Sequence, residues 1–169
     1  MKREEKIRIV VMDDRPVVLY GLQSWFESHE RFQVTACVRN AEQLFARLKS
    51  AKYDVIVVSS VCADSGALLR ELRQVFPATP VVVFTDETGA HALAEMQRAG
   101  AAGIVSTREE ARAFERVCSR VLSGASNVVS PRIVAYCEAG VAGDSVGAFD
   151  ARSVYRDVRV TIRPFVAQA

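Results

Sequence analysis

The chain has 169 residues, of which half are hydrophobic and a quarter are charged, a balance typical of soluble globular proteins. Its 22 Lys and Arg residues and 20 Asp and Glu residues leave a net charge of +2, which argues against a polyanion-binding surface over the whole chain. We expect a cytoplasmic protein, because the sequence shows neither a secretory signal nor an apolar run of about 18 residues. The four scattered cysteines predict free thiols rather than a zinc site.

Five short runs of β-branched and apolar residues predict five strands. Continuous runs of this kind are typical of parallel strands that are buried on both faces of a sheet. The second run alternates between polar and apolar residues, which predicts a strand at the edge of the sheet. The five runs are Ile7–Met12, Phe32–Val38, Val55–Val58, Val81–Phe84 and Ile104–Val105.

Helical patterns follow each of these runs. Pro16 suits the first turn of the first helix, and Asn40 suits the N-cap of the second. The third helix is expected to end before Pro77, and the last two are predicted to span Ala90–Ala99 and Ala111–Leu122. This alternation predicts an α/β fold with a doubly wound, five-stranded parallel sheet, in which sites form at the carboxyl ends of the strands.

Polar residues mark two of these strand ends. Asp13 and Asp14 follow the first strand and Ser59 follows the third, and in such a sheet these two ends lie side by side. An acidic pair that faces a third carboxylate would form a magnesium and phosphoryl-transfer pocket. Here the third position holds a hydroxyl, so the sequence predicts the fold without that chemistry.

The pattern changes after Gly124. Ser130 and Pro131 open a short apolar segment, and the residues before position 149 are rich in Gly and Ala. The tail combines Arg residues at helical spacing with Val and Ile residues that alternate as in a strand, so its structure is weakly specified. We expect a globular domain over 6–124, a linker with a short helix over 125–148 and an irregular C-terminal extension over 149–169.

Two segments resemble bacterial response-regulator receiver domains of the LuxR/NarL type. Val10–Leu22 combines an acidic pair, a Pro and a Gly-containing helix, and Arg98–Val105 is similar to that subfamily's entry into the fifth strand. The resemblance covers about residues 6–124 and implies a flavodoxin-like (βα)5 receiver fold and a role in two-component signal transduction. In that family an acidic pair helps to bind magnesium and an Asp on the third strand accepts phosphate from a histidine kinase.

Carried over residue by residue, the resemblance implies a degenerate pocket. Asp13 and Asp14 match the acidic pair, and Thr85 matches the hydroxyl switch residue that ends the fourth strand. The family's phosphoacceptor Asp, its common switch aromatic and the Lys that ends its fifth strand are replaced here by Ser59, Ile104 and Thr107, respectively.

These replacements predict that the standard chemistry is lost. The neutral hydroxyl of Ser59 needs a base before it can attack phosphorus, and none is evident in the sequence beside it. With one of three carboxylates missing, Mg²⁺ binding by Asp13 and Asp14 is expected to be weak or absent. Thr107 lacks the positive charge that would pair with a phosphoryl oxygen. We therefore expect no standard aspartyl phosphorylation, no required cofactor and no enzymatic activity.

Several alternatives remain open at this pocket. The acidic pair is either a relic rim, solvated or paired to Arg15, or a weak cation site. Asp64 would accept phosphate only with a changed loop register, and another kinase could modify Ser59 or Ser60. Cys62 stands where the family has Met, and it is either a reactive thiol or an inert, partly buried side chain.

The fifth helix carries Arg112, Arg116 and Arg120 at intervals of four residues, which predicts either a solvated charged face or a partner face. Receivers of the type resembled often dimerise or dock through their fourth and fifth helices. The function predicted is therefore an atypical receiver that acts in signal transduction or transcription control through a protein partner or a second copy at this face. No membrane partner is expected.

The alternative function is a truncated LuxR-type two-component regulator that has lost its DNA-binding helix-turn-helix domain. Such a domain does not fit in the residues after Arg132, so DNA binding by this chain alone is not expected. The Arg residues of the tail are weak evidence for it without a helix-turn-helix pattern. A shifted reading frame after Gly147 would account for the irregular tail.

Overall fold

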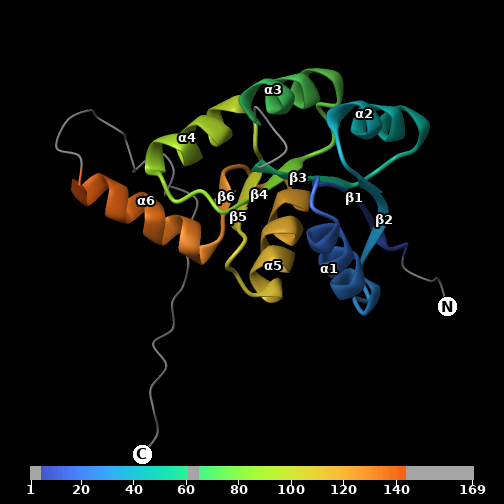
Figure 1. The fold of residues 1–169 in the computed structure, drawn as a ribbon, viewed down its shortest axis with the longest axis horizontal. Helices are drawn as coiled ribbons and strands as arrows, with labels where there is room; N and C mark the ends of the chain where they lie inside the picture. Colours follow the sequence, from blue (N-terminus) through green and yellow to red (C-terminus); the bar gives the residue numbers. More distant parts are fainter. Residues whose placement is uncertain (1–4, 61–64, 144–169) are drawn as a thin grey trace, which may run out of the picture.

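The computed structural model describes residues 5–60 and 65–143, which form a parallel β-sheet between layers of helices (Figure 1). Within these residues the sheet has six strands in the order β2-β1-β3-β4-β5-β6. The strands are β1 (Ile7–Met12), β2 (Phe32–Val38), β3 (Val55–Ser59), β4 (Val81–Thr85), β5 (Gly103–Ser106) and β6 (Val128–Val129). The helices are α1 (Pro16–Glu27), α2 (Ala41–Ser50), α3 (Ser65–Val75), α4 (Ala90–Ala99), α5 (Ala111–Leu122) and α6 (Pro131–Gly143).

The predicted α/β class and doubly wound parallel sheet are confirmed, but the predicted number of five strands is wrong. β6 contains only Val128 and Val129, which pair in parallel with Gly103 and Ile104 of β5. A run of two apolar residues does not by itself show the periodicity of a strand, and the sequence prediction missed this one. It lies in the segment predicted to be a linker. The predicted irregular extension over 149–169 lies outside the described residues.

Local signals place the ends of several helices where the sequence predicts them. Pro16 is the first residue of α1, and the side chain of Asn40 caps α2 by accepting a 2.9 Å hydrogen bond from the backbone N of Gln43. Both α4 and α5 have the predicted bounds. α4 ends at Gly100, whose φ of 119° lies in the left-handed region that glycine adopts at low cost.

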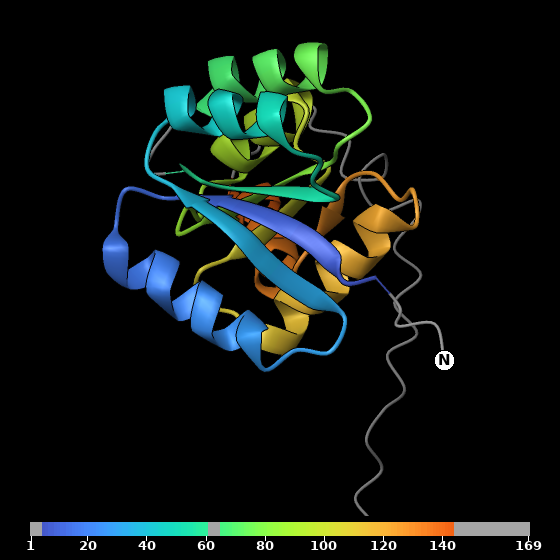
Figure 2. The same ribbon diagram turned by 90° about the vertical axis from the view of Figure 1, so that its right-hand side faces the viewer.

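Two hydrophobic cores lie on the two faces of the sheet. α2, α3 and α4 cover one face, and α1 and α5 cover the other (Figure 2). Successive side chains of a strand point to opposite faces, so Val10 and Met12 of β1 join the first core whereas Ile9 and Val11 join the second. This double burial explains why the central strands are continuous apolar runs.

The strand register brings the ends of β1 and β3 together. Met12 of β1 pairs with Val58 of β3, and Ser59 pairs with Phe84 of β4. Asp13 directly follows Met12 and therefore lies beside Ser59. Because β1 is flanked by β2 on one side and β3 on the other, this rim is the switch point of the strand order, where open α/β sheets bind ligands.

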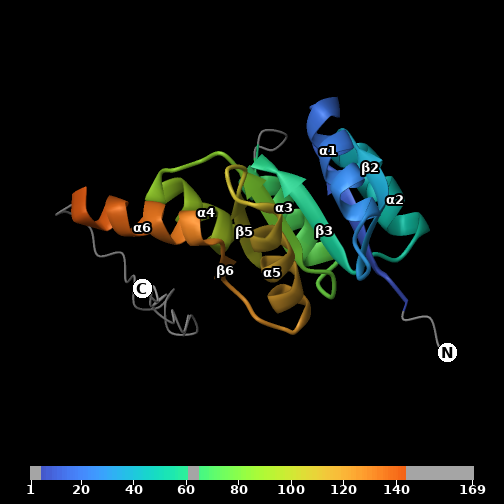
Figure 3. The same cartoon turned by 90° about the horizontal axis from the view of Figure 1, so that it is seen from below.

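α6 has 13 residues and packs against α4 and β5 (Figure 3). Its buried Ile133 joins the core on the α4 side of the sheet. Gly140 permits a close approach, because a Cβ atom at this position would lie 2.6 Å from the Cβ of Ala90. α6 lies within segment 125–148 and packs on β5 and α4. No helix among the described residues has the length and apolar character needed to cross a membrane.

Candidate functional site

The candidate site centres on Asp13, which follows β1 at the carboxyl rim of the sheet. Its side chain is only 1% exposed, and its backbone N donates to the carbonyl oxygen of Val38 at 3.1 Å. A carboxylate removed from water costs several kcal/mol unless it is paired and hydrogen-bonded. The structure must therefore supply a partner for this charge.

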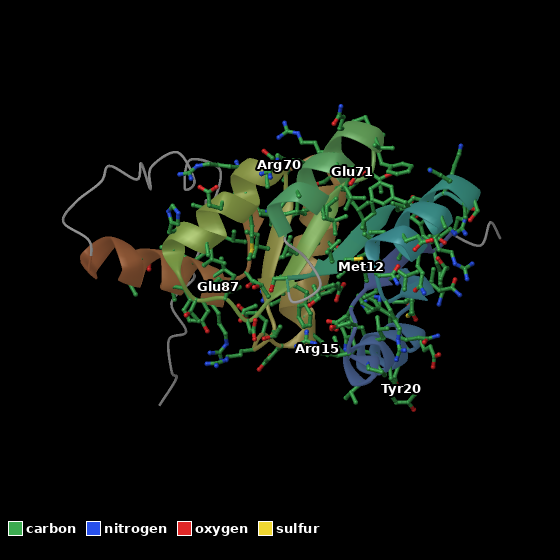
Figure 4. All side chains as sticks on the ribbon, turned by 45° about the horizontal axis from the view of Figure 1, so that its top comes forward. Met12, Arg15, Tyr20, Arg70, Glu71 and Glu87 are labelled. Carbon is green, nitrogen blue, oxygen red and sulfur yellow. The ribbon has the colours of Figure 1, made fainter. Side chains whose placement is uncertain are left out.

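Arg15 is the partner of Asp13. Its backbone N and its Nε donate to Oδ1 of Asp13 at 2.8 and 3.0 Å, and its Nη2 donates to Oδ2 at 2.8 Å. The guanidinium thus binds both carboxylate oxygens in the fork geometry that Arg makes with carboxylates. Figure 4 shows Arg15 at the rim, near the start of α1.

Ser59 completes a three-residue group, called here the Arg15 cluster (Asp13, Arg15 and Ser59). The Ser59 hydroxyl accepts a 3.2 Å hydrogen bond from Nη2 of Arg15 and is also hydrogen-bonded to Asp13. Ser59 is 2% exposed. Ser59, which the sequence predicts to stand at the phosphoacceptor position, is therefore buried and hydrogen-bonded to both Asp13 and Arg15.

The Arg15 cluster stabilises its charges mutually. Burial raises the pKa of Asp13, but hydrogen bonds from Arg15 and Ser59, together with the nearby positive charge, outweigh burial and hold that pKa below its ordinary value. The hydrogen bond to Asp13 is the largest cause that raises the pKa of Arg15, and the charges of Asp86 and Asp14 add to it. Both the carboxylate and the guanidinium are therefore charged at neutral pH.

The residues present do not fit a magnesium site of the kind that an acidic pair suggests. Mg²⁺ demands a near-octahedral shell of oxygens, but both oxygens of Asp13 accept hydrogen bonds from Arg15. Asp14 is exposed at the surface, and Ser59 offers only a hydroxyl. Residues 5–60 and 65–143 contain no group of three or more His, Cys, Asp or Glu side chains that could hold a metal ion. The rim is built around a guanidinium instead.

Thr85, predicted from the sequence to be the switch residue, is buried at the end of β4 and held in place by hydrogen bonds. Its Oγ1 accepts from the hydroxyl of Ser60 at 2.8 Å and from the backbone N of Glu87 at 3.0 Å. Its carbonyl oxygen accepts from the backbone N of Thr107 at 2.8 Å. Thr107 therefore lies next to Thr85, and its side chain carries no charge.

Ile104, predicted from the sequence to replace the switch aromatic, is 1% exposed and belongs to the core on the α4 side. Two hydrogen bonds join the end of β5 and the loop that follows it to the start of α6 and the residue before it. The backbone N of Ser106 donates to Oγ of the buried Ser130 at 3.2 Å, and the backbone N of Arg132 donates to Oε1 of Glu109 at 2.6 Å. Glu109 thus satisfies an amide at the start of α6 and connects the rim to that helix.

Sequence reasoning named Arg15 only as a partner for the acidic pair and missed its contact with Ser59, 44 residues away. The signal in the sequence was Arg15, a cation two residues after Asp13 whose backbone is restricted by the following Pro16. The bond between Ser60 and Thr85 was also missed, because it joins separate strands. Cys62 and Asp64 lie outside the described residues, so both remain predictions.

The α4 and α5 surface predicted to bind a partner is not wholly open, because α6 packs on α4. On α5 the side chains of Arg112, Arg116 and Arg120 are exposed. The basic part of the predicted face is therefore accessible, whereas the part of α4 around Ala90 contacts α6 at Gly140.

Known proteins resemble this chain both in sequence and in fold. The family description of the response regulator receiver domain matches residues 9–117. The probable transcriptional regulatory protein SgaR of Hyphomicrobium methylovorum is 28% identical over 107 residues, which cover 62% of this chain and 51% of SgaR. This chain thus spans about half the length of that curated relative.

Two solved structures illustrate the likeness of the fold. A two-component response regulator of the LuxR family from Aurantimonas sp. SI85-9A1 matches with a TM-score of 0.73 and 21% identity, over 82% of this chain and 99% of that one. RcsB of Salmonella typhimurium matches with a TM-score of 0.73 and 18% identity, over 82% of this chain and 69% of RcsB. RcsB has also been solved as dimers bound to DNA.

Proposed function

Because this chain belongs to the response regulator receiver family, we propose that it is an atypical receiver that signals by protein contact without standard aspartyl phosphorylation. Its relationship to transcriptional regulatory proteins supports a role in signal transduction or transcription control. The observation that carries the proposal is the state of Ser59, a buried hydroxyl bound by Arg15 at the position where the family has its phosphoacceptor Asp.

The chemistry of Ser59 supports this proposal. A carboxylate attacks a phosphoryl donor directly, whereas a hydroxyl must lose a proton to a base. The neighbouring Asp13 is a poor base at neutral pH, because Arg15 and Ser59 hold its pKa below the ordinary value. Thr107 brings no cation to pair with a phosphoryl oxygen.

Incubation with acetyl phosphate and Mg²⁺ tests the proposal. The protein is expected to keep its unmodified mass, because Ser59 offers no carboxylate and both oxygens of Asp13 accept hydrogen bonds from Arg15. Intact-mass spectrometry before and after hydroxylamine treatment measures this, and a receiver with the full Asp and Lys set serves as the positive control. Stoichiometric, hydroxylamine-labile phosphate on this chain would refute the proposal.

A Ser59→Asp variant extends the same experiment. It is expected to restore switching only in part, because Thr107 still lacks the positive charge of Lys. The matched variant Ser59→Asp/Thr107→Lys is expected to incorporate more phosphate under identical conditions. Full switching by Ser59→Asp alone would mean that the charge at position 107 matters less than proposed.

The proposed contact surface is the face of α4 and α5, with the exposed Arg112, Arg116 and Arg120 as its basic part. A protein partner or a second copy of the chain would dock there. Such a surface could act without phosphorylation, because its shape and charge are present in the fold itself.

The second candidate is the receiver of a LuxR-type transcriptional regulator. The observation that favours it is the likeness to the probable transcriptional regulatory protein SgaR, of which this chain covers 51%. The test is to translate the coding DNA beyond Gly147 in all three frames. An open frame that encodes a helix-turn-helix would support this candidate, and the lack of one would refute it.

A further inference from the structure

We propose that Arg15 is the resident cation of this pocket, and that its guanidinium engages the Asp13 oxygens that a divalent metal would need and so holds the rim in one metal-independent state. The inference deepens the proposed function and rests on it. It adds that Asp13 could still serve as a metal ligand, and that Arg15 prevents this by binding both oxygens of its carboxylate.

The backbone at the start of α1 fixes the position of Arg15. Arg15 is the N-cap of α1, with an extended φ of −89° and ψ of 109°, and Pro16 begins the helix. A residue before proline is restricted to this extended region, so the conformation costs little. The backbone N of Arg15 also donates to Oδ1 of Asp13, which anchors the residue at both its backbone and its side chain.

The contacts of the guanidinium match what a bound cation would provide. Arg15 neutralises the buried Asp13 through both carboxylate oxygens and reaches the Ser59 hydroxyl on the adjacent strand. Asp14 and Asp86 add negative charge around the same group. A guanidinium never loses its charge at physiological pH, so this cation is permanent, whereas a metal ion would bind and dissociate.

Two changes should therefore convert the rim into a metal site. Ser59→Asp restores a carboxylate beside Asp13, and Arg15→Ala removes the competing cation. Ser59→Asp alone should bind metal only weakly, because Arg15 would bind the new carboxylate as well. This dependence on Arg15 separates the proposal from the simpler view that the loss of one carboxylate is the whole reason for weak metal binding.

Mn²⁺ binding measured by electron paramagnetic resonance tests the proposal, with Mg²⁺ as the competitor. The Ser59→Asp/Arg15→Ala variant is expected to bind Mn²⁺ at least about tenfold more tightly than either the unaltered protein or Ser59→Asp. Equal binding by Ser59→Asp and the double variant would overturn the proposal. So would a double variant that is folded and binds no more tightly than the unaltered protein.

The matched control is Ser59→Asp/Arg39→Ala. Arg39 directly follows β2 at the same rim, and its side chain is exposed. Because both variants replace one Arg by Ala, the control has the same net charge as the test variant. It is expected to bind Mn²⁺ no more tightly than Ser59→Asp does. Tighter binding by this control would mean that any lost Arg charge suffices, which would overturn the specific role of Arg15.

A double-mutant cycle keeps the proposal testable if Arg15→Ala weakens folding. Arg15→Ala leaves the buried Asp13 charge unpaired, and Asp13→Asn removes that charge. The destabilisation of Asp13→Asn/Arg15→Ala is therefore expected to be clearly smaller than the sum of the two single effects, as measured by thermal unfolding. Additive effects would overturn the proposal. Acetyl phosphate tests the proposed function independently, because it detects phosphate rather than metal.

Discussion

At the scale of single residues, the Arg15 cluster shows how a buried carboxylate is balanced by a guanidinium of the same chain. Asp13 is 1% exposed and would be costly to bury alone, whereas its partner Arg15 keeps 39% of its side chain exposed. The pair therefore sits at the boundary between core and solvent. Solvent screening moderates its strength, but both oxygens of the buried carboxylate remain bonded.

The lowered pKa of Asp13 predicts how stability depends on pH. The pKa of Asp13 in the folded state lies below its ordinary value of 3.8. The contribution of Asp13 to the free energy of unfolding is therefore fully present above pH 3.8 and is lost as the pH falls through the folded-state pKa. Asp13→Asn should therefore flatten the dependence of the unfolding free energy on pH below about 4. Urea denaturation at a series of pH values measures this slope, and an unchanged slope would contradict the assignment.

At the scale of secondary-structure elements, α6 belongs to the folded body. Ile133 is fully buried in the core on the α4 side, and Ser130 and Glu109 connect the start of the helix to the end of β5. The predicted partner face therefore shares α4 with a helix of the same chain. A partner at this face would contact α6 as well, or would displace it from α4.

Truncation of Ile133 tests how firmly α6 is packed. Ile133→Ala should lower the free energy of unfolding by about 2–4 kcal/mol, because it removes a fully buried side chain and leaves a cavity. Arg132→Ala, one residue away, is the control, since its side chain is exposed and should change stability by less than about 0.5 kcal/mol. Chemical denaturation measures both values, and equal effects would mean that α6 is only loosely held.

At the scale of the whole molecule, the described residues form one sheet with a core on each face. The elements after position 124 contribute to this body, because β6 extends the sheet and α6 covers part of it. The surface that remains for partners is therefore set by β6 and α6 as well as by the elements from β1 to α5.

Shortened proteins test this contribution. A protein that ends at Gly143 keeps every described contact and should unfold cooperatively, whereas one that ends at Asn127 loses β6 and α6. The shorter protein should show a clearly lower melting temperature, because β5 loses its hydrogen-bonded neighbour and Ile104 is exposed. Calorimetry of both proteins measures the difference, and equal melting temperatures would show that the C-terminal elements add no stability.

The sequence by itself determined the α/β class, the five long strands, the bounds of α4 and α5, and the placement of Asp13 beside Ser59. Apolar periodicity, Pro and Gly signals and the rule that parallel strands end at one rim are all local or general, so they can be read without coordinates. Only the tertiary structure decided that Arg15 bridges Asp13 and Ser59, that Ser60 holds Thr85 and that α6 packs on α4. These contacts join segments far apart in the chain, and their partners exist only once the sheet register and helix packing bring them within hydrogen-bonding distance.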